Sequence, residues 1–167
     1  AYVEEAPDAP QPTDVEAVET GRGKFEVEIR TGRHLMFADE PTDFGGLDNG
    51  PSPFQLVSAA VAACMTMTVR LYADRKGWPV RRIRAGVGHS RDDGESPRDR
   101  FDVRVTSDGP LDDEQHGKLL EIARKCPVHR LISDGASFSV VASPEPAPCE
   151  SPEAHELEME RVAKGDA

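Results

Sequence analysis

Hydrophobic and polar residues alternate along several short stretches of the chain, which is the pattern of half-buried β-strands. Residues 24–30 place three apolar side chains on one face and charged side chains, Glu26 among them, on the other. A turn at Thr31 and Gly32 then predicts that residues 34–38 pair back on this strand as a hairpin. Further strands are predicted at residues 15–19, 80–88, 100–106 and 136–142.

Two stretches have the composition or the periodicity of helices. From Pro53 to Lys76 the sequence is dense in Ala, Leu and Met, with a proline at the first helical position, where it is favoured. A second helix opens at Asp112, and Gln115 is placed to complete a capping box. Pro127 disfavours helical backbone at the residue before it, so this helix should stop or kink there. The second helix carries one apolar stripe, at Leu119, Ile122, Ala123 and Cys126.

The order of these elements predicts an α+β domain with antiparallel sheets. Residues 54–69 of the first helix carry no charge on any face, so the helix needs cover on all sides. A single sheet covers one side only, and we therefore expect a second copy of the chain to cover the rest in an obligate homodimer. The same run is shorter than the ~20 apolar residues of a membrane-spanning helix, so we expect no membrane partner.

The formal net charge of -11 lies entirely at the two ends of the chain. Residues 1–20 hold six acids and no base, residues 144–167 hold seven acids and two bases, and residues 21–143 are neutral. Half of the fourteen prolines lie in the same end segments. This division predicts an acidic extension at 1–20, one domain at 21–143 and an acidic tail at 144–167. Such ends are too polar to repay their ordering by burial, and we expect their removal to leave the site intact.

Charge and cysteine content also limit the environment of the protein. An acidic chain repels the phosphate backbone, so we expect no nucleic-acid partner. The acidic start does not resemble a secretory signal, and three cysteines do not form a secreted disulfide framework. We therefore expect a cytoplasmic protein, in which paired cysteines are reactive or bind metal more often than they are structural.

Two cysteines are the candidates for chemistry. Cys64 lies in the middle of the first helix and Cys126 at the end of the second, and buried cysteines often serve only as small hydrophobic residues. Cys126, however, stands at a helix break among basic residues at 124, 125, 129 and 130, a setting that lowers a thiol pKa. Metal binding is the alternative, because Cys126 and His129 have ligand-like spacing and Cys64 with His34 or His89 would complete a zinc tetrahedron. The lone Cys-x-x-His motif is weak and no cofactor motif occurs, so we expect neither metal nor cofactor.

Several motifs together resemble the OsmC/Ohr family, and its OsmC-like branch in particular. They are His34-Leu-Met-Phe-Ala-Asp-Glu-Pro41, Gly45-Gly46, Gly50-Pro-Ser-Pro53, Ala62-Ala-Cys64-Met-Thr-Met-Thr68, Tyr72-Ala73 and Lys125-Cys-Pro-Val-His-Arg130. The resemblance covers nearly all of residues 21–143. It implies an α+β fold in which two intertwined subunits hold their central helices between sheets.

The resemblance also implies a thiol peroxidase that acts on organic hydroperoxides and less well on hydrogen peroxide. In this role Cys64 attacks the peroxide and becomes a sulfenic acid, and Cys126 resolves it as a disulfide that an external dithiol reduces. An arginine of the N-terminal hairpin activates the thiol in the family, and Arg33 is the position most like it. His129 and Arg130 are alternative activating groups.

This sequence departs from the family at one point. The glutamate that holds the family's arginine would fall at Phe54 or Gln55, and neither is acidic. Either Glu40 or another acid takes that role, or this member is a weaker peroxidase. Two non-catalytic alternatives remain: a dimer that binds an apolar ligand in a cleft lined by Met65 and Met67, and a structural stress protein. Cys149 lies outside the matched region and is expected to be an exposed bystander.

Overall fold

The computed structural model describes residues 13–146 and 154–165, which divide into two compact units. Of the described residues, the N-terminal unit holds 13–53 and 137–146. The helical unit holds residues 54–136 and the C-terminal helix. The elements are α+β with antiparallel sheets, as the sequence predicted.

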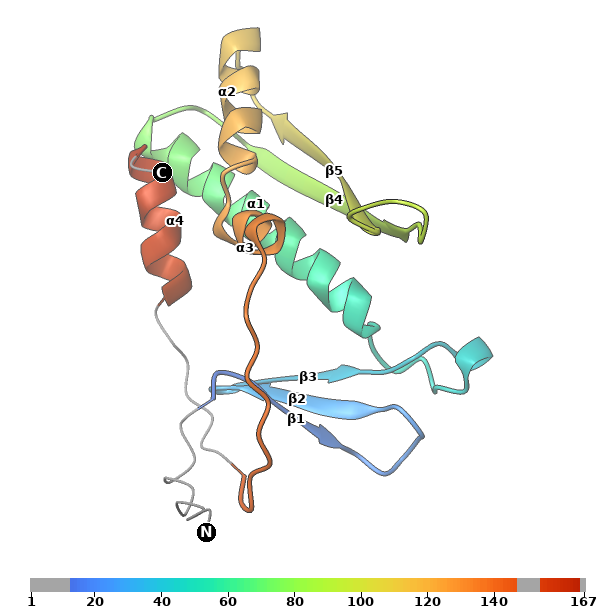
Figure 1. The fold of residues 1–167 in the computed structure, drawn as a ribbon. Coiled ribbons are helices and arrows are strands. Elements are labelled where there is room, and N and C mark those ends of the chain that lie inside the picture. The colour runs from blue at the N-terminus through green and yellow to red at the C-terminus, as the bar shows by residue number, and fades with distance from the viewer. Residues whose placement is uncertain (1–12, 147–153, 166–167) are drawn as a thin grey trace. The chain divides into compact units, whose positions relative to one another are not determined.

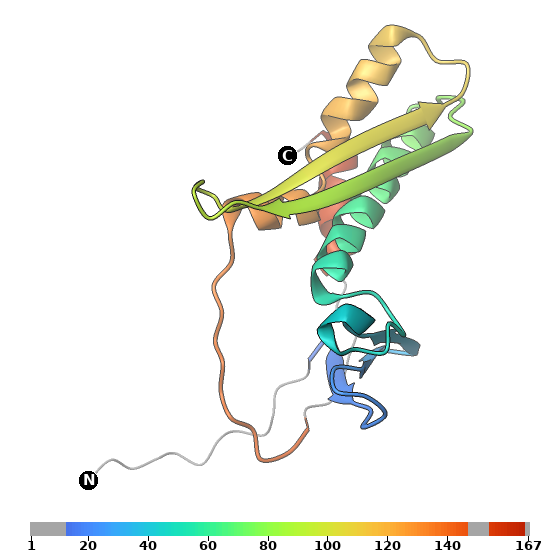
Figure 2. The same ribbon diagram turned by 90° about the vertical axis from the view of Figure 1, so that its right-hand side faces the viewer.

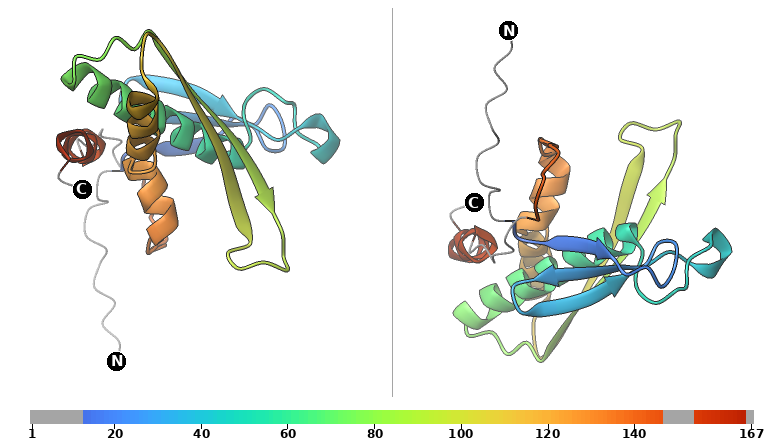
Figure 3. Two further views of the ribbon diagram at one scale, coloured as in Figure 1. Left: turned by 90° about the horizontal axis from the view of Figure 1, so that it is seen from above. Right: turned by 90° about the horizontal axis from the view of Figure 1, so that it is seen from below.

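The N-terminal unit is built on a three-stranded antiparallel sheet in the order β1-β2-β3 (Figure 1; Figure 3, right). Its strands are β1 (Glu16–Glu19), β2 (Val27–Thr31) and β3 (His34–Ala38). Thr31 pairs with His34 across the turn, so the predicted hairpin is confirmed.

Glu26 was expected on the outer, charged face of its strand, and this expectation is wrong. The residue precedes β2 and is only 1% exposed. Its carboxylate accepts hydrogen bonds from Thr20 Oγ1, from Arg22 Nε at 2.6 Å and from Asn49 Nδ2 at 2.6 Å. These partners hold the pKa of Glu26 below its ordinary value, with the Thr20 hydrogen bond first among the causes. The alternation predicts faces only for residues inside a ladder, and Glu26 lies just before one.

A second buried acid holds the loop that follows β3. Asp39 is 2% exposed, and its carboxylate accepts the backbone N–H groups of Glu40, Leu47 and Asn49. Within this loop a one-turn 3₁₀ helix, η1 (Thr42–Phe44), ends at Gly45, whose φ of 94° favours glycine. The Gly-Gly motif seen in the sequence is therefore a requirement of the loop's backbone.

The helical unit contains a two-stranded antiparallel sheet and four helices (Figure 1, Figure 2). The strands β4 (Arg82–Arg91) and β5 (Asp99–Asp108) form a long hairpin that runs across α1, and α2 lies beside it in Figure 2. Along β5 half-buried and exposed residues alternate, as the sequence predicted. The helices are α1 (Pro53–Arg75), α2 (Asp113–Ala123), α3 (Pro127–Asp134) and α4 (Ala154–Lys164).

One face of α1 forms the core of this unit. Its buried residues are Val61, Cys64, Met65, Thr68, Val69, Tyr72 and Ala73. By length and composition α1 is apolar enough to cross a membrane, a test that core helices of other proteins also pass. The buried residues pack against the apolar stripe of α2, which has the capping box predicted at Asp112 and Gln115.

The second half of the chain differs from the sequence-based expectations in three features, although α2 ends before Cys126 as predicted. The chain continues after Cys126 into α3, a helix that the sequence pattern did not predict. Residues 136–142 form no strand in the described chain, and Phe138 and Val140 are 90% and 93% exposed. Their alternation is genuine, but a strand also needs an edge that accepts its backbone hydrogen bonds.

The third correction concerns the acidic C-terminal tail, which was expected to be solvated throughout. Residues 154–164 form α4, and Val162 is 2% exposed within the hydrophobic core of the helical unit. Helix α4, drawn in red in Figure 3, packs against α3. The Nη2 of Arg75 in α1 lies 3.8 Å from the carboxylate of Glu160 in α4. The net charge of a segment therefore did not reveal the short apolar stripe inside it.

Candidate functional site: a buried cysteine pair beside an apolar pocket

The helical unit brings together the two cysteines that the sequence singled out. Cys64 comes from the middle of α1 and is 2% exposed, and Cys126 comes from the α2–α3 junction and is fully buried. Both are free thiols, and the Cys64 side chain is a hydrogen-bond partner of Cys126. Residues that lie 62 positions apart in sequence are thus in side-chain contact in the core.

The position of Cys126 follows from the proline after it. Pro127 cannot continue α2, but its fixed φ suits the first turn of a new helix, so α3 begins there. Cys126 becomes the N-cap of α3, with extended ψ of 141°, and its sulfur accepts the backbone N–H of His129 at 3.4 Å. The helix break directs this thiol toward α1.

Contact with Cys64 changes the protonation of Cys126. The sequence predicted a lowered thiol pKa at Cys126 because basic residues surround it in the sequence, and this is wrong. The pKa of the Cys126 thiol is raised above its ordinary value, first by the hydrogen bond with Cys64 and then by burial. The backbone N–H groups of His129 and Val128 act in the opposite direction. Two thiols in contact titrate as a pair, and the contact with Cys64 favours the protonated form of Cys126.

Cys64 has a polar neighbour one turn further along α1. Its Sγ lies 3.9 Å from Oγ1 of Thr68, a residue that is fully buried. A hydroxyl at this position is able to donate to a thiolate. Thr68 was not predicted as a neighbour of Cys64, although its spacing of four residues on the same helix could have revealed it.

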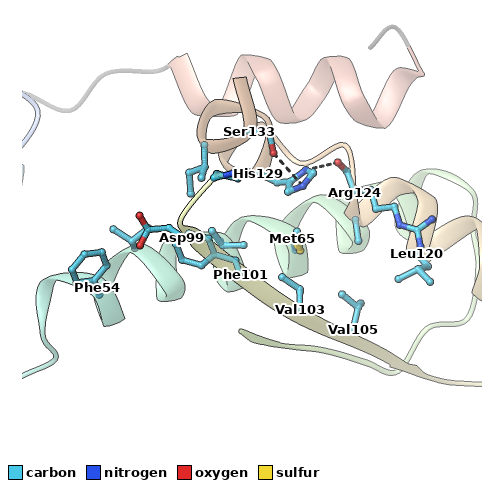
Figure 4. Close-up of a pocket in the computed structure, with 15 residues that line it drawn as sticks. Phe54, Met65, Asp99, Phe101, Val103, Val105, Leu120, Arg124, His129 and Ser133 are labelled. Atoms are coloured by element: carbon cyan, nitrogen blue, oxygen red, sulfur yellow. Dashed lines mark hydrogen bonds between the residues drawn. The ribbon is translucent and has the colours of Figure 1, made fainter. Parts of the chain in front are cut away.

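An apolar pocket of about 820 Å³ lies beside the cysteine pair (Figure 4). Helix α1 contributes Val61 and Met65, which flank Cys64 on the same helical face, and α2 contributes Ala123. Neither cysteine sulfur is part of the lining, so the pair lies behind this wall. Pockets of this size and character suit small apolar ligands.

Three polar residues stand together in the wall of the pocket formed by α3 and the end of α2 (Figure 4). His129 Nδ1 lies 2.7 Å from the carbonyl oxygen of Arg124, which only accepts hydrogen bonds, so this nitrogen carries a proton. His129 Nε2 lies 3.4 Å from Oγ of Ser133. The expectation that His129 lies near the site is therefore consistent with its place in the pocket wall.

The other residues named from the sequence lie in different surroundings. Met65 lines the pocket and is 4% exposed, whereas Met67 is 53% exposed and is not part of the lining. Gln55 is exposed on the first turn of α1, and Arg130 is exposed on α3. For Gln55, Met65 and Met67 the sequence predicted the helix but not the face, whereas Arg130 lies on a helix that the sequence pattern did not predict.

The candidate residues of the N-terminal unit are Arg33 and Glu40. Arg33 is exposed on the turn between β2 and β3, and Glu40 is half-buried at the start of the loop after β3. The role of Arg33 as an activating cation, and of Glu40 as its partner, stays a prediction. Cys149 lies outside the described residues.

The zinc alternative has no set of ligands in the described part of the chain. Among residues 13–146 and 154–165, no three His, Cys, Asp or Glu side chains gather as metal ligands do. His89, one of the proposed ligands, has its Nε2 2.8 Å from Asp99 Oδ1 instead. His34 belongs to the N-terminal unit.

The sequence model of the OsmC-like protein family matches residues 46–141, which is more than half of the chain. The chain belongs to this family. The matched region includes α1, the β4–β5 hairpin, α2 and α3, and therefore both cysteines of the pair. No curated protein matches the sequence.

Solved structures share the fold of this OsmC-like protein at low sequence identity. An osmotic-stress and detoxification response protein from Psychrobacter arcticus is 18% identical, with a TM-score of 0.61 over 83% of this chain and 93% of that one. An OsmC-like protein from Mycoplasma pneumoniae is 17% identical, with a TM-score of 0.57 over 74% and 88%. An organic hydroperoxide resistance protein from Legionella pneumophila is 22% identical, with a TM-score of 0.54 over 75% and 91%.

Proposed function

We propose that this protein is a two-cysteine thiol peroxidase that reduces organic hydroperoxides. The observation that carries the proposal is the contact between the buried Cys64 and Cys126 beside an apolar pocket. A peroxidase of this kind needs a second thiol within bonding reach of the first, and a pocket that accepts an alkyl group. The family of the chain includes hydroperoxide resistance proteins, which supports the same chemistry.

In the first step the Cys64 thiolate attacks the terminal oxygen of the hydroperoxide. The new S–O bond forms as the O–O bond breaks, which gives a sulfenic acid at Cys64 and an alkoxide that takes a proton to leave as the alcohol. We assign Cys64 as the nucleophile because the hydrogen bond with Cys64 and burial raise the pKa of the Cys126 thiol. The Cys126 S–H then donates to the thiolate, and Thr68 is placed to donate a second hydrogen bond.

In the second step Cys126 attacks the sulfur of the sulfenic acid. The S–S bond forms, the S–O bond breaks, and the hydroxide that leaves takes the Cys126 proton and becomes water. The disulfide is then reduced by an external dithiol, which is oxidised to its own disulfide. The second thiol prevents further oxidation of Cys64 to the irreversible sulfinic acid.

We also propose that the protein acts as a homodimer. In addition to its pocket face, α1 exposes a second apolar face along Ala59, Ala63 and Met67. The alternating segment with Phe138 and Val140 is exposed as well. Both are the kind of surface that a second copy of the chain would cover.

Steady-state reduction of cumene hydroperoxide and hydrogen peroxide, with dithiothreitol as the reductant, tests the proposal. The wild type is expected to turn over both, with the organic peroxide preferred. Cys64→Ser is expected to abolish turnover, and Cys149→Ser, the matched control outside the pair, is expected to leave it unchanged. Equal activity of Cys64→Ser and wild type would contradict the proposal.

The pocket itself favours a second candidate function, the binding of an apolar ligand without turnover. The same experiment separates the two functions. A binding protein would show no peroxide consumption above that of Cys64→Ser, but it would still bind an apolar molecule such as cumyl alcohol.

A further inference from the structure

The pocket extends along α1 away from the cysteine pair. Four residues of α1 line it: Phe54, Val57, Val61 and Met65. Phe54 lies at the far end of this row in Figure 4, beyond Asp99 and Phe101. It precedes Cys64 by ten residues, which corresponds to about 15 Å of helix.

Phe54 is held in a stack of side chains from the β4–β5 hairpin. Its ring lies 4.6 Å from the His89 ring, centroid to centroid, with only 7° between the planes. The guanidinium of Arg91 lies 5.4 Å from the centre of the Phe54 ring. The His89 ring in turn lies 4.8 Å from that of Phe101. The first turn of α1 is thus attached to the hairpin through its aromatic residue.

One carboxylate joins the two hairpin residues that contact Phe54. Asp99 Oδ1 accepts from Arg91 Nε at 3.0 Å and lies 2.8 Å from His89 Nε2, and Asp99 Oδ2 accepts from Arg91 Nη2 at 2.9 Å. These partners, Arg91 foremost, lower the pKa of Asp99 to about 2. Asp99 is therefore a carboxylate at neutral pH, and it fixes both Arg91 and His89 by charge-assisted hydrogen bonds.

We propose that Phe54 is a specificity-determining residue that forms the end wall of the pocket, and that Asp99 positions it through Arg91 and His89. An alkyl chain whose reactive end is at Cys64 meets this wall after about a dozen carbons, because an extended zigzag of C–C bonds of about 1.5 Å advances by about 1.25 Å per carbon. The pocket therefore limits the chain length of its ligand. This inference rests on the proposed function only in placing the reactive end of the ligand at Cys64.

The geometry also gives a role to the position where this chain departs from its family's acidic pattern. Phe54 is apolar, yet it is 48% exposed, and the arginine that lies over its ring is hydrogen-bonded to a carboxylate of the hairpin. A phenyl ring that only packed the core would be expected to be buried. A ring half-exposed at a pocket end and fixed by a carboxylate is suited to contact a ligand.

Binding of n-alkan-1-ols of six to fourteen carbons to the reduced protein tests the proposal. The affinity of each alcohol is measured by its displacement of a fluorescent apolar probe. Each added methylene is expected to raise the affinity of the wild type about threefold to fourfold, and the gain should stop near the chain length that reaches Phe54. Alcohols do not react with the cysteines, so this result does not depend on peroxide turnover. A protein that binds the series but consumes no peroxide would refute the proposed function and leave the length limit standing.

Variants distinguish a role of Phe54 as the end wall of the pocket from a general effect on packing. Phe54→Ala is expected to move the limit to longer chains by at least two carbons, and Phe54→Leu, which keeps apolar bulk, to restore it. Asp99→Asn is expected to shift the limit in the same direction as Phe54→Ala. Asp102→Asn is the matched control, because Asp102 forms a similar pair with Arg100 on the same strand but is not part of the pocket lining.

The outcomes that overturn the proposal are specific. A limit that stays in place in both Phe54→Ala and Asp99→Asn would show that the wall lies elsewhere. A wild type whose affinity does not depend on chain length would show that the pocket does not hold alkyl chains in this direction. A shift in Asp102→Asn equal to that in Asp99→Asn would show that the effect is one of hairpin stability.

Discussion

Cys126 owes its chemistry to the residue that follows it. Pro127 ends α2 and starts α3, and Cys126 is left as an N-cap whose sulfur is directed toward Cys64. The sequence predicted the break at Cys126 and singled out both cysteines as candidates. It could not predict their contact, because that depends on how α1 and α2 pack. The stack around Phe54 was also missed, since its members lie on three separate elements.

Replacement of the second thiol tests its role at the residue scale. In Cys126→Ser we expect one equivalent of peroxide to be consumed per chain, and then oxidation of Cys64 to the sulfinic acid as more is added. The reason is that the sulfenic acid has lost the neighbour that intercepts it. Mass spectrometry of the Cys64 peptide measures this, and a sulfinic acid that appears equally fast in the wild type would contradict it.

The protonation of Asp99 gives a second prediction at this scale. Its pKa is lowered from 3.8 to about 2 by Arg91 and His89, so the folded state favours the carboxylate. The associated stability is present above the ordinary pKa and is lost as the pH falls through about 2. We expect the urea midpoints of unfolding of wild type and Asp99→Asn to differ near neutral pH. The two midpoints should converge between about pH 4 and pH 2, the interval between the ordinary and the lowered pKa of Asp99. A difference that stays constant over this range would contradict the assignment.

At the scale of elements, the hairpins and the two long helices were predictable because each is defined by a local pattern. Residues 34–38 and the capping box of α2 appear in the structure as predicted. Helix α3 was not predicted, because Pro127 was interpreted only as the end of α2 and not also as the first residue of a new helix. The strand predicted at 136–142 does not form in the described chain. Its alternation is a local pattern, but a strand also needs a neighbouring strand, which a local pattern does not reveal.

The acidic composition of residues 144–167 did not predict that α4 packs on the core of the helical unit. Val162→Ala is expected to lower the free energy of unfolding by about 2 kcal/mol, because it removes two buried carbons from the core. Arg161→Ala, on the exposed side of the same helix, is the control and is expected to change it by less than about 0.5 kcal/mol. Urea unfolding measures both, and equal stability of the two variants would show that α4 contributes nothing to the core.

At the scale of the whole molecule, the charge of -11 does not mark a binding function. The acidic C-terminal segment contains a helix that packs on the core, so the extension is more than a solubility device. Apolar residues on one face of α1 and in the segment around Phe138 are exposed in the single chain, and the proposed homodimer would cover them. The fold class followed from the sequence, but the assembly that completes it has to be measured.

Sedimentation at micromolar concentration measures the assembly. We expect a dimer in the wild type, and we expect Met67→Glu to weaken it, because a charge on the exposed face of α1 would be buried at the interface. Asp74→Lys, further along α1 at an exposed charged position, is the control. A folded wild-type monomer at this concentration would contradict the proposed homodimer.

The most direct test of the central claim is to identify the bond that peroxide creates. One equivalent of cumene hydroperoxide is added to the fully reduced protein, the free thiols are counted, and the linked peptides are identified by mass spectrometry. The account predicts the rapid loss of two thiols per chain and a single disulfide between Cys64 and Cys126. Unchanged thiols, or a disulfide that forms only through Cys149, would contradict it.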